Sequence, residues 1–354
     1  MWNGATFMKR ILGFLTLLFL LFTSGCNQQP EGESAISEES TVSEESTFEY
    51  YKGRPQDVSI PVQCYETPPE NPVVLFDDAQ GAYLFDYVEE ELVGTTKTIV
   101  VNGKELVGDY RKTSMSWVPA PIIKYRCAGS DEDRYEAVLF SITQLYDELM
   151  SITFTPNYNC VIDIPIGVEE AREICKAFIR ENTDIDLDAY NTDAPPLREP
   201  ELYPDGMYRE TYYFWFEKMV NGIMESALSF EIGADGYFRR FVWWHSRFDE
   251  MIEIPDWPDE YYQNAAQEKL EEVYEAYYSE GKLKELLGSF EPTGPVTAVT
   301  DLEIRLKELT YLHEHHSPAV TMYCPHTVVF ENGEELKREL TLYMLIGESG
   351  SQTE

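Results

Sequence analysis

Residues 212–244 read YYFWFEKMVNGIMESALSFEIGADGYFRRFVWW. This stretch contains three apolar runs, 212–218, 227–232 and 238–244, separated by Asn221-Gly222 and Asp235-Gly236. Such dipeptides favour the tight turns of β-hairpins, because they tolerate the positive φ angles that those turns require. In the middle run, apolar and polar residues alternate, which is typical of a strand with one buried face. We therefore expect three antiparallel strands here.

An amphipathic helix is predicted just before these strands. Its apolar residues recur at the 3.6-residue spacing of one helix face; they are Val168, Ala171, Ile174, Cys175, Phe178 and Ile179. We interpret Cys175 as a small core residue and expect Phe178 to insert between the helix and the sheet face that carries Phe230. Polar residues fill the gaps, among them Arg172, which we place on the opposite, solvent-facing side.

The same order of elements follows after residue 256. A helix is expected to begin near Asp259, where Pro258 and two acidic residues suit a first turn. Three strands are expected after it: 302–306, then 319–330 with an interruption at Pro325, then 340–346. The matching order predicts a duplicated unit of one helix and three strands, although the residues themselves barely repeat.

Strands are also predicted between residues 58 and 155. Two runs, 97–101 and 104–110, flank Asn102-Gly103, which is the strongest short signal for a hairpin. Three further runs of strand-forming residues follow at 122–126, 137–143 and 150–155. Turn-forming residues separate these runs, so the pattern predicts an antiparallel meander.

Together these elements predict an α+β fold. An N-terminal antiparallel β meander takes residues 49–162, and two helix-plus-three-strand antiparallel units take residues 163–255 and 256–349. A chain of 354 residues with 14% aromatic residues has ample material for the cores of two or three such domains.

The N-terminus has the pattern of an export signal. The basic pair Lys9-Arg10 precedes an apolar run, 11–22, which is too short to cross a bilayer. Small residues then lead to Cys26. The sequence resembles a bacterial lipoprotein signal, in which the cysteine after the cut is lipidated, although Thr23 stands where such signals usually carry Leu. Cleavage and free secretion without a lipid is the alternative interpretation.

This resemblance implies a signal peptide at residues 1–25 and a lipid, such as palmitate, on Cys26. Residues 26–48 are rich in Ser and Glu and contain no Lys or Arg, so we interpret them as a disordered acidic tether. A single acyl chain holds a protein only marginally, whereas two or more hold it stably, and the lipoprotein pathway supplies more than one. The expected location is the outer face of the cell membrane of a Gram-positive bacterium.

The charge of the chain limits its partners. The net charge is −37 at pH 7, which excludes nucleic acid, because an acidic surface repels a phosphate backbone. Anionic lipids and polyanionic wall polymers are repelled as well, so attachment to the membrane must come from the lipid. Besides Cys26 the chain has five cysteines, an odd number without short paired spacings, which argues against a disulfide framework.

The hairpin-rich stretch also carries a family resemblance. The run 213–218, the turn at 220–222, the strand 228–233 and the turn 235–237 resemble the PepSY-type unit and the related YcdB/YcdC repeat of Gram-positive cell-envelope proteins. The helix opening at 168–171 matches as well. The resemblance covers about two thirds of the mature chain and implies a non-enzymatic envelope module, which in some relatives is proposed to regulate peptidases. It carries no catalytic residues over to this chain.

Enzyme motifs are absent from the sequence, which contains no G-x-S-x-G, H-E-x-x-H, P-loop, C-x-x-C or G-x-G-x-x-G. The clustered metal-type ligands are His313, His315 and His316, with Cys324 and His326 nearby. His313 and His315 lie at strand spacing that would let them share a zinc ion, whereas we expect His326 opposite position 309, too far away to join them. A polar hairpin end with solvated histidines is the simpler interpretation.

Two other groups of residues are weighed as sites. Asp184, Asp186 and Asp188 have the spacing that opens a calcium loop, but the rest of the loop does not match, which favours a plain acidic loop. Tyr213 and Trp215 must point away from the core-facing residues of their strand. Either a second layer covers them, which we favour, or they form an exposed ligand surface.

We therefore predict a membrane-anchored extracytoplasmic lipoprotein that binds or regulates and does not catalyse, with no cofactor. Its expected partners are the membrane, through the lipid, and an envelope protein or peptidase. The candidate site residues are Tyr213 and Trp215 for a ligand and His313 and His315 for a metal. The alternative function is a cell-envelope metal-dependent hydrolase that uses His313 and His315.

Overall fold

The computed structural model describes residues 63–76, 85–101, 103–115, 121–129, 134–144, 147–156, 161–244, 252–288, 290–292, 294–312, 315 and 317–348. All of them belong to one compact unit, Pro55–Glu354. The predicted signal peptide, Cys26 and the tether lie outside the described residues.

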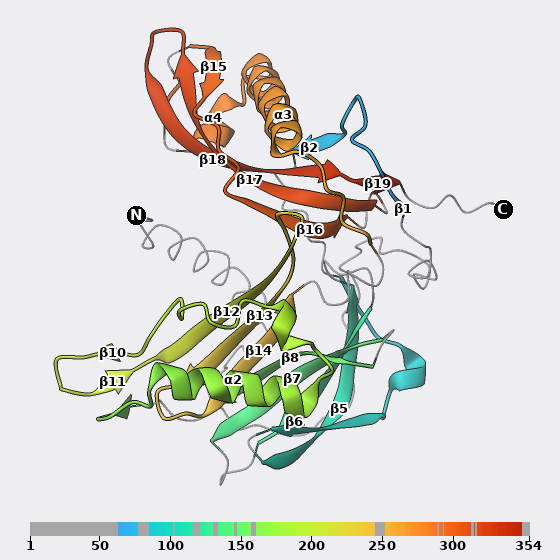
Figure 1. Ribbon diagram of the computed structural model, residues 1–354, viewed down its shortest axis with the longest axis vertical. Coiled ribbons are helices and arrows are strands. Elements are labelled where there is room, and N and C mark those ends of the chain that lie inside the picture. The colour runs from blue at the N-terminus through green and yellow to red at the C-terminus, as the bar shows by residue number, and fades with distance from the viewer. Residues whose placement is uncertain are drawn as a thin grey trace, which may run out of the picture. The chain divides into compact units, whose positions relative to one another are not determined.

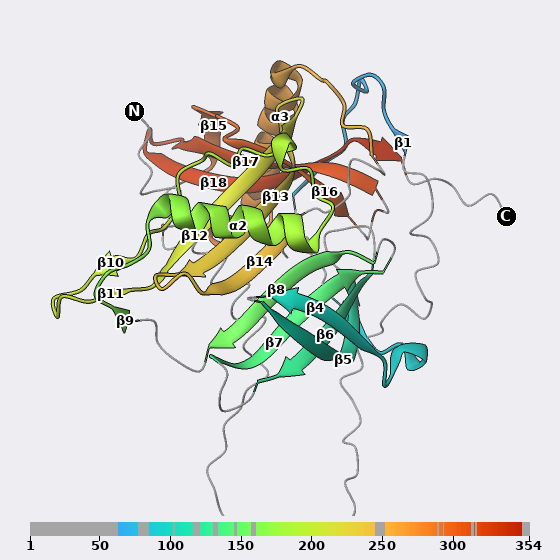
Figure 2. The ribbon, with the colours of Figure 1, turned by 60° about the horizontal axis from the view of Figure 1, so that its bottom comes forward.

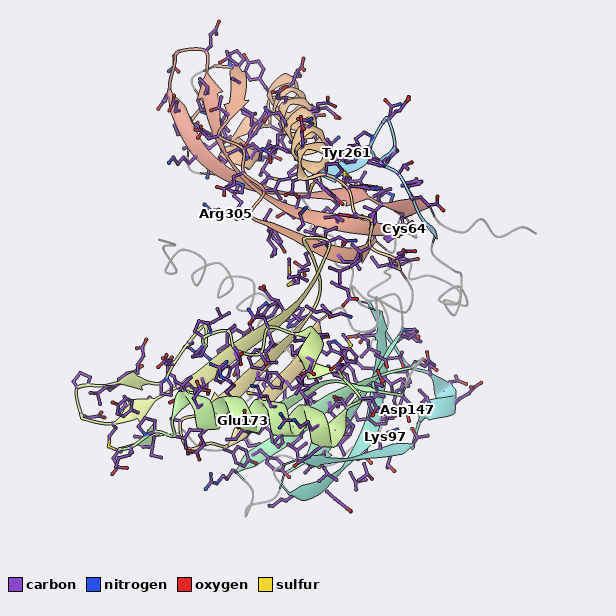
Figure 3. All side chains as sticks on the ribbon, viewed as in Figure 1. Cys64, Lys97, Asp147, Glu173, Tyr261 and Arg305 are labelled. Atoms are coloured by element: carbon purple, nitrogen blue, oxygen red, sulfur yellow. The ribbon has the colours of Figure 1, made fainter. Side chains whose placement is uncertain are left out.

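Consecutive antiparallel strands form the first part of the described chain. They are β3 (Phe85–Tyr87), β4 (Thr96–Val101), β5 (Lys104–Met115), β6 (Ile122–Ala128), β7 (Tyr135–Thr143) and β8 (Leu149–Pro156). Strands β5 to β8 pair in chain order, while β3 and β4 pair with β5. Val101 pairs with Lys104, which confirms the hairpin predicted there. Lys97 on β4 forms an ion pair of 2.6 Å with Asp147, which precedes β8 (Figure 3).

Three long strands and a helix follow. Helix α2 (Val168–Asn182) precedes β12 (Thr211–Val220), β13 (Ile223–Gly233) and β14 (Phe238–Trp244). Asn221 and Gly222 both have positive φ, 50° and 71°, as the type I′ turn between β12 and β13 requires. This helix and these three strands are where the sequence predicts them. Figures 1 and 2 show α2 lying across one face of β12, β13 and β14.

The second helix, α3 (Asp259–Ser279), also begins where predicted and is followed by the short α4 (Leu283–Leu287). Four strands come next: β15 (Val296–Thr300), β16 (Leu306–Leu312), β17 (Ser317–Phe330) and β18 (Glu335–Leu345). Both β15 and β16 pair with β17. The strand predicted at 302–306 is therefore wrong: residues 302–305 link two strands, and the positive φ of Asp301, 51°, marks the interruption.

Strand β17 is not interrupted at Pro325, contrary to the prediction. Pro325 pairs with Glu339 of β18, and its carbonyl accepts a hydrogen bond from the Glu303 N–H at 3.1 Å. In an antiparallel ladder the N–H and C=O of one residue point to the same side. The missing N–H of Pro325 thus faces the irregular link before β16, where it costs no regular ladder bond.

The predicted α+β fold class is wrong, because the described part of the chain is mainly β. One mixed sheet of 14 strands runs in the order β2-β18-β17-β16-β13-β14-β8-β7-β6-β5-β3, with β12, β15 and β4 attached to β13, β17 and β5. Strand β2 (Val74–Phe76) pairs with β18, β8 pairs with β14, and β13 pairs in parallel with β16 through Met224 and Glu308. The expected helix-plus-three-strand units are therefore not separate sheets.

Short strands complete the described fold. β1 (Gln63–Cys64) pairs with β19 (Gly347–Glu348), and β11 (Tyr208–Arg209) pairs with both β9 (Val161–Ile162) and β10 (Glu201–Leu202). Two single-turn 3₁₀ helices, η2 (Glu90–Leu92) and η3 (Leu187–Ala189), lie in connecting segments.

In the described part of the chain, two large hydrophobic cores hold the sheet. The first core lies between α2 and the strands of the first part of the sheet. Within it, the ring centroid of Phe178 on α2 is 4.2 Å from that of Phe238 and 6.5 Å from that of Phe230. The second lies around α3 and β15 to β18 and includes Ile223, next to the tip of the β12–β13 hairpin. The long hairpin thus contributes to both cores. The predicted burial of Cys175 is confirmed, with 0% exposure.

Arg172 corrects the predicted solvent-facing side of α2. Its side chain is buried, and its guanidinium donates hydrogen bonds of 2.7 Å to the carbonyls of both Thr192 and Ala194. It also lies over the ring of Phe214 at 5.4 Å. The segment after the helix folds back over this side, which the spacing of residues within the helix does not show.

Candidate functional site

The face of the sheet away from α2 holds the predicted ligand residues Tyr213 and Trp215. Strand register defines the two faces, because cross-strand partners share a face and successive residues alternate. The face toward α2 carries a row of apolar residues in register: Phe214, Phe230, Phe241, Ile152, Phe140 and Tyr125. We call the opposite face of β12, β13, β14, β8, β7, β6 and β5 the outer face.

One row of the outer face is rich in small hydroxyl residues. In register from β12 to β5 it consists of Trp215, Ser229, Val242, Ser151, Ser141, Lys124 and Lys112, and we call it the serine row. The hydroxyls of Ser141 and Ser151 form a short hydrogen bond with each other. Ser229 Oγ accepts a hydrogen bond of 3.1 Å from Trp244 Nε1. The row thus places three hydroxyls, which both donate and accept hydrogen bonds, on neighbouring or nearly neighbouring strands.

Two indole rings meet at the β12 end of the serine row. The ring centroids of Trp215 and Trp244 are 5.7 Å apart with an interplanar angle of 47°. Trp244 is buried, whereas Trp215 is half-buried. Trp215 Nε1 donates to Glu217 Oε1 at 3.1 Å, which holds the outer indole in place. The half-buried ring of Trp215 therefore leaves apolar surface beside polar groups.

A second row lies next to the serine row. In register it consists of Tyr213, Glu231, Arg240, Thr153, Leu139, Arg126 and Asp109, and we call it the charged row. Arg240 and Glu231 form an ion pair of 3.5 Å. Tyr213 is buried, and its hydroxyl interacts with Ser229 of the serine row, although not with the geometry of a good hydrogen bond. Burial raises the pKa of Tyr213, so the hydroxyl keeps its proton.

The carboxyl group of Glu217 is perturbed at the same end of the face. Burial raises its pKa, the hydrogen bond from Trp215 opposes this shift, and the negative charge of Glu308 on β16 raises it further. The Glu308 carboxylate accepts a hydrogen bond of 3.0 Å from the Tyr323 hydroxyl. Perturbed titratable groups are enriched at functional sites, so this end of the outer face is the candidate site.

An ionic cluster closes the other end of the serine row. Asp86 on β3 accepts a hydrogen bond of 2.5 Å from Lys112, bonds with Ser114 and lies 3.6 Å from Lys124. Burial alone would raise the pKa of Asp86, but the hydrogen bonds and charges of these partners lower it. Burial lowers the pKa of Lys124, and the charge of Asp86 opposes this. Asp86 therefore lies beside both lysines and offsets part of their charge.

A second polar network lies where the β12–β13 hairpin leaves the first core. Lys218 Nζ lies 3.0 Å from the buried carboxylate of Glu225, which also accepts a hydrogen bond of 3.0 Å from Ser226. The hydroxyls of Ser226 and Tyr190 are 2.8 Å apart, and Trp243 Nε1 donates to Tyr190 at 3.1 Å. Each of these groups has a partner, so the network holds the hairpin in place.

The predicted metal ligands are not brought together in the described part of the chain. His315 is exposed, and His313 and His316 lie outside the described residues. His326 is buried, where Nδ1 donates to the Cys324 carbonyl at 2.7 Å and Nε2 accepts from the Tyr274 hydroxyl at 2.8 Å. The described residues contain no group of three or more His, Cys, Asp or Glu side chains that could hold a metal ion.

His326 is also not where the sequence predicts it. The turn between β16 and β17 is placed by the pairing of Leu312 with Ser317, so His326 lies level with residues 302–303 and not with residue 309. Asp186, predicted as part of a plain acidic loop, accepts a hydrogen bond of 3.1 Å from the Asp188 N–H and caps η3. Among the described cysteines, Cys64, Cys175 and Cys324 are free.

The sequence missed most members of the outer face. Alternation within β12 was sufficient to place Tyr213 and Trp215 together, but Ser151 and Ser141 join them only because β14 pairs with β8. These strands are almost ninety residues apart in the chain, and local patterns do not give the register of such a pair.

No family model matches this chain, and no curated protein or solved structure is significantly similar to it. Among the described residues, no helix combines the length and the apolar character needed to cross a membrane.

Proposed function

We propose that this chain is a non-catalytic binding lipoprotein of the cell envelope, anchored to the outer face of the membrane by a lipid on Cys26 and binding its ligand on the outer face of the sheet. The lipoprotein pattern of residues 1–26 supports the anchor. The net charge of −37 supports a partner other than nucleic acid and an attachment that does not depend on charge.

The observation that carries the proposal is the half-buried indole of Trp215. Its ring lies against that of Trp244 at 5.7 Å, and its Nε1 donates a hydrogen bond to Glu217, so the ring is fixed on the outer face. Tryptophan side chains often contribute strongly to binding, because they offer a large apolar area beside a polar group.

An envelope protein or peptidase is one kind of partner for this surface, and a cell-wall component is another. Both kinds of partner can bind to an aromatic ring that has hydrogen-bonding groups beside it, which is what the outer face offers. The metal-dependent hydrolase predicted as an alternative gains no support from the described residues, in which His315 is exposed.

Binding to lipid-extracted cell envelopes tests the proposal, because the anchor cannot then account for retention. The lipidated chain, kept in detergent, is mixed with such envelopes and sedimented. We expect the parent to sediment with them and Trp215→Ala to bind at least tenfold more weakly, about 1.4 kcal/mol. Tyr278→Ala is the matched control, since Tyr278 is 45% exposed on α3, away from this face. Equal binding of the parent and Trp215→Ala would overturn the proposal.

A further inference from the structure

We propose that the free edge of β4 is a second binding surface, to which an extended, basic peptide adds as a further strand. Strand β4 hydrogen-bonds to β5 along one edge, and no strand in the described part of the chain pairs with its other edge. In the run of strands from β12 to β4, it lies at the opposite end from β12, which carries Trp215. The surface is therefore distinct from the site proposed on the outer face.

The hydrogen-bonding groups along this edge follow from the pairing of β4 with β5. The Tyr110 N–H donates to the Thr95 carbonyl at 3.0 Å, just before β4 begins. In an antiparallel pair the backbone groups of successive residues point to opposite edges, so every second residue from Thr95 onward faces β5. The residues between them point their N–H and C=O groups to the free edge; they are Thr96, Thr98 and Val100. Among the described residues, these groups have no backbone partner.

The three residues of this edge are open to solvent. All of them are exposed, Val100 to 48%. Val107 of β5, which pairs with Thr98 and lies diagonally across from Val100 on the same face, is 53% exposed. On the other face of β4, Ile99 and Val101 belong to the first core. A peptide can therefore reach the edge and the exposed face of β4, while the core face is already covered.

Strand β4 also lacks the features that usually keep a sheet edge from pairing. Proteins protect such edges with proline, bulges or charged side chains. Strand β4 contains no proline, pairs with β5 without a bulge, and has one charged residue, Lys97, whose side chain forms an ion pair with Asp147. All its other residues are β-branched, which favours an extended backbone. An accessible edge of this kind suits β-strand addition, in which main-chain hydrogen bonds hold an extended peptide.

The charges near β4 favour a basic peptide. Glu90 and Glu91 in η2, which precedes β4, are exposed, and so is Glu105, which pairs with Val100. Lys104 in the hairpin offsets part of this charge. The net charge of the whole chain is −37, so a basic peptide is attracted, whereas an acidic peptide or a second copy of this chain is repelled. Because the exposed face offers valine side chains, a peptide that alternates apolar and basic residues fits best.

The test uses a dye-labelled peptide of alternating valine and lysine, about eight residues long so that it spans the strand. The full chain in detergent is titrated against it and binding is followed by fluorescence anisotropy. We expect the peptide to bind, and we expect the same peptide with a methyl group on every backbone amide to bind at least tenfold more weakly. Methylation removes the N–H donors and keeps every charge, so it separates strand pairing from general attraction to an acidic chain.

Substitutions of Thr98 test the same edge from the side of the protein. Thr98→Pro removes an N–H that points to the free edge and leaves the hydrogen bonds to β5 in place. It should weaken binding of the unmethylated peptide at least tenfold. Thr98→Val keeps this N–H and the β-branched shape, so it is the matched control and should leave binding unchanged.

Three outcomes would overturn the proposal. One is the absence of peptide binding, or equal binding of the methylated and unmethylated peptides, which would leave only attraction between charges. Another is binding that a folded Thr98→Pro variant does not weaken, which would place the peptide elsewhere. The last is a dimer of the parent, seen by sedimentation, that Thr98→Pro abolishes, which would make a second copy the occupant of the edge. If Thr98→Pro does not fold, the comparison of the two peptides on the parent still decides.

Discussion

The indole of Trp215 lies against that of Trp244, with ring centroids 5.7 Å apart, on the face of the sheet that α2 does not cover. Trp244 is anchored by its hydrogen bond to Ser229, and Trp215 by its hydrogen bond to Glu217. Both rings are thus fixed before any ligand binds. Fixed aromatic side chains lose little conformational entropy on binding, which suits a recognition surface.

Phe178 tests how α2 is held on the sheet. Its ring packs against Phe238 at 4.2 Å and Phe241 at 5.2 Å, and the residue is 5% exposed. Phe178→Ala should lower the free energy of unfolding by about 3 to 5 kcal/mol, because the cavity cannot close fully. Urea denaturation measures this change. Glu173→Ala on the exposed side of the same helix (Figure 3) should change it by less than about 1 kcal/mol. Equal losses would show that α2 does not pack through Phe178.

Arg172 makes a prediction opposite to that from the sequence alone. Arg172→Ala leaves the carbonyls of Thr192 and Ala194 without their donor and removes the cation over Phe214. The expected loss in unfolding free energy is about 2 to 3 kcal/mol, since hydrogen bonds from charged groups contribute about 1.5 to 3 kcal/mol each. Arg180→Ala, at an exposed position of α2, is the control and should cost less than about 1 kcal/mol. A loss as small as that of the control would instead agree with the solvent-facing position that the sequence predicts for Arg172.

Such residues show which features of the fold can be predicted from the sequence. Helix periodicity located α2 and α3, and Asn-Gly turns located the hairpins, because both signals are local. The prediction of the fold class was wrong because the pairing of β8 with β14 and of β2 with β18 depends on register between distant strands. The predicted exposure of Arg172 was also wrong, since its hydrogen-bond partners lie in a loop twenty residues further on. Tyr213 and Trp215 were found by alternation, but their serine neighbours required the sheet.

His326 predicts a dependence of stability on pH. Burial lowers its pKa below the usual 6.5, while the Cys324 carbonyl and Glu339 oppose this shift and Arg338 adds to it. The unfolded chain therefore binds a proton at His326 at a higher pH than the folded chain. Stability from this group is fully present above about pH 6.5 and is lost as the pH falls below it, by up to about 1.4 kcal/mol per pH unit.

Unfolding in urea at pH 7 and at pH 5.5 measures this loss. His326→Gln removes the titrating group, so the difference between the two pH values should be smaller in this variant than in the parent. Glu339 and Tyr274 are present in both proteins, so their own contributions to the pH dependence of stability cancel in the comparison. An equal difference in the two proteins would show that His326 does not titrate differently in the folded and unfolded states.

The lipid anchor predicts the behaviour of Cys26→Ala. The thioether to Cys26 is the proposed attachment, and each buried methylene of an acyl chain contributes about 0.8 kcal/mol to membrane binding. The variant should incorporate no labelled palmitate, and it should be either left uncut or released into the medium. Metabolic labelling and cell fractionation measure both properties. A variant that is cut and still retained at the membrane like the parent would contradict the anchor.

The outer face as a binding surface is the central claim, and hydrogen exchange of the backbone amides tests it most directly. The full chain in detergent is compared with and without lipid-extracted cell envelopes. The account predicts slower exchange in β12, β13, β14 and β8 when envelopes are present, and no such change in Trp215→Ala. Slower exchange confined to other parts of the chain, or the same slowing in Trp215→Ala, would contradict it.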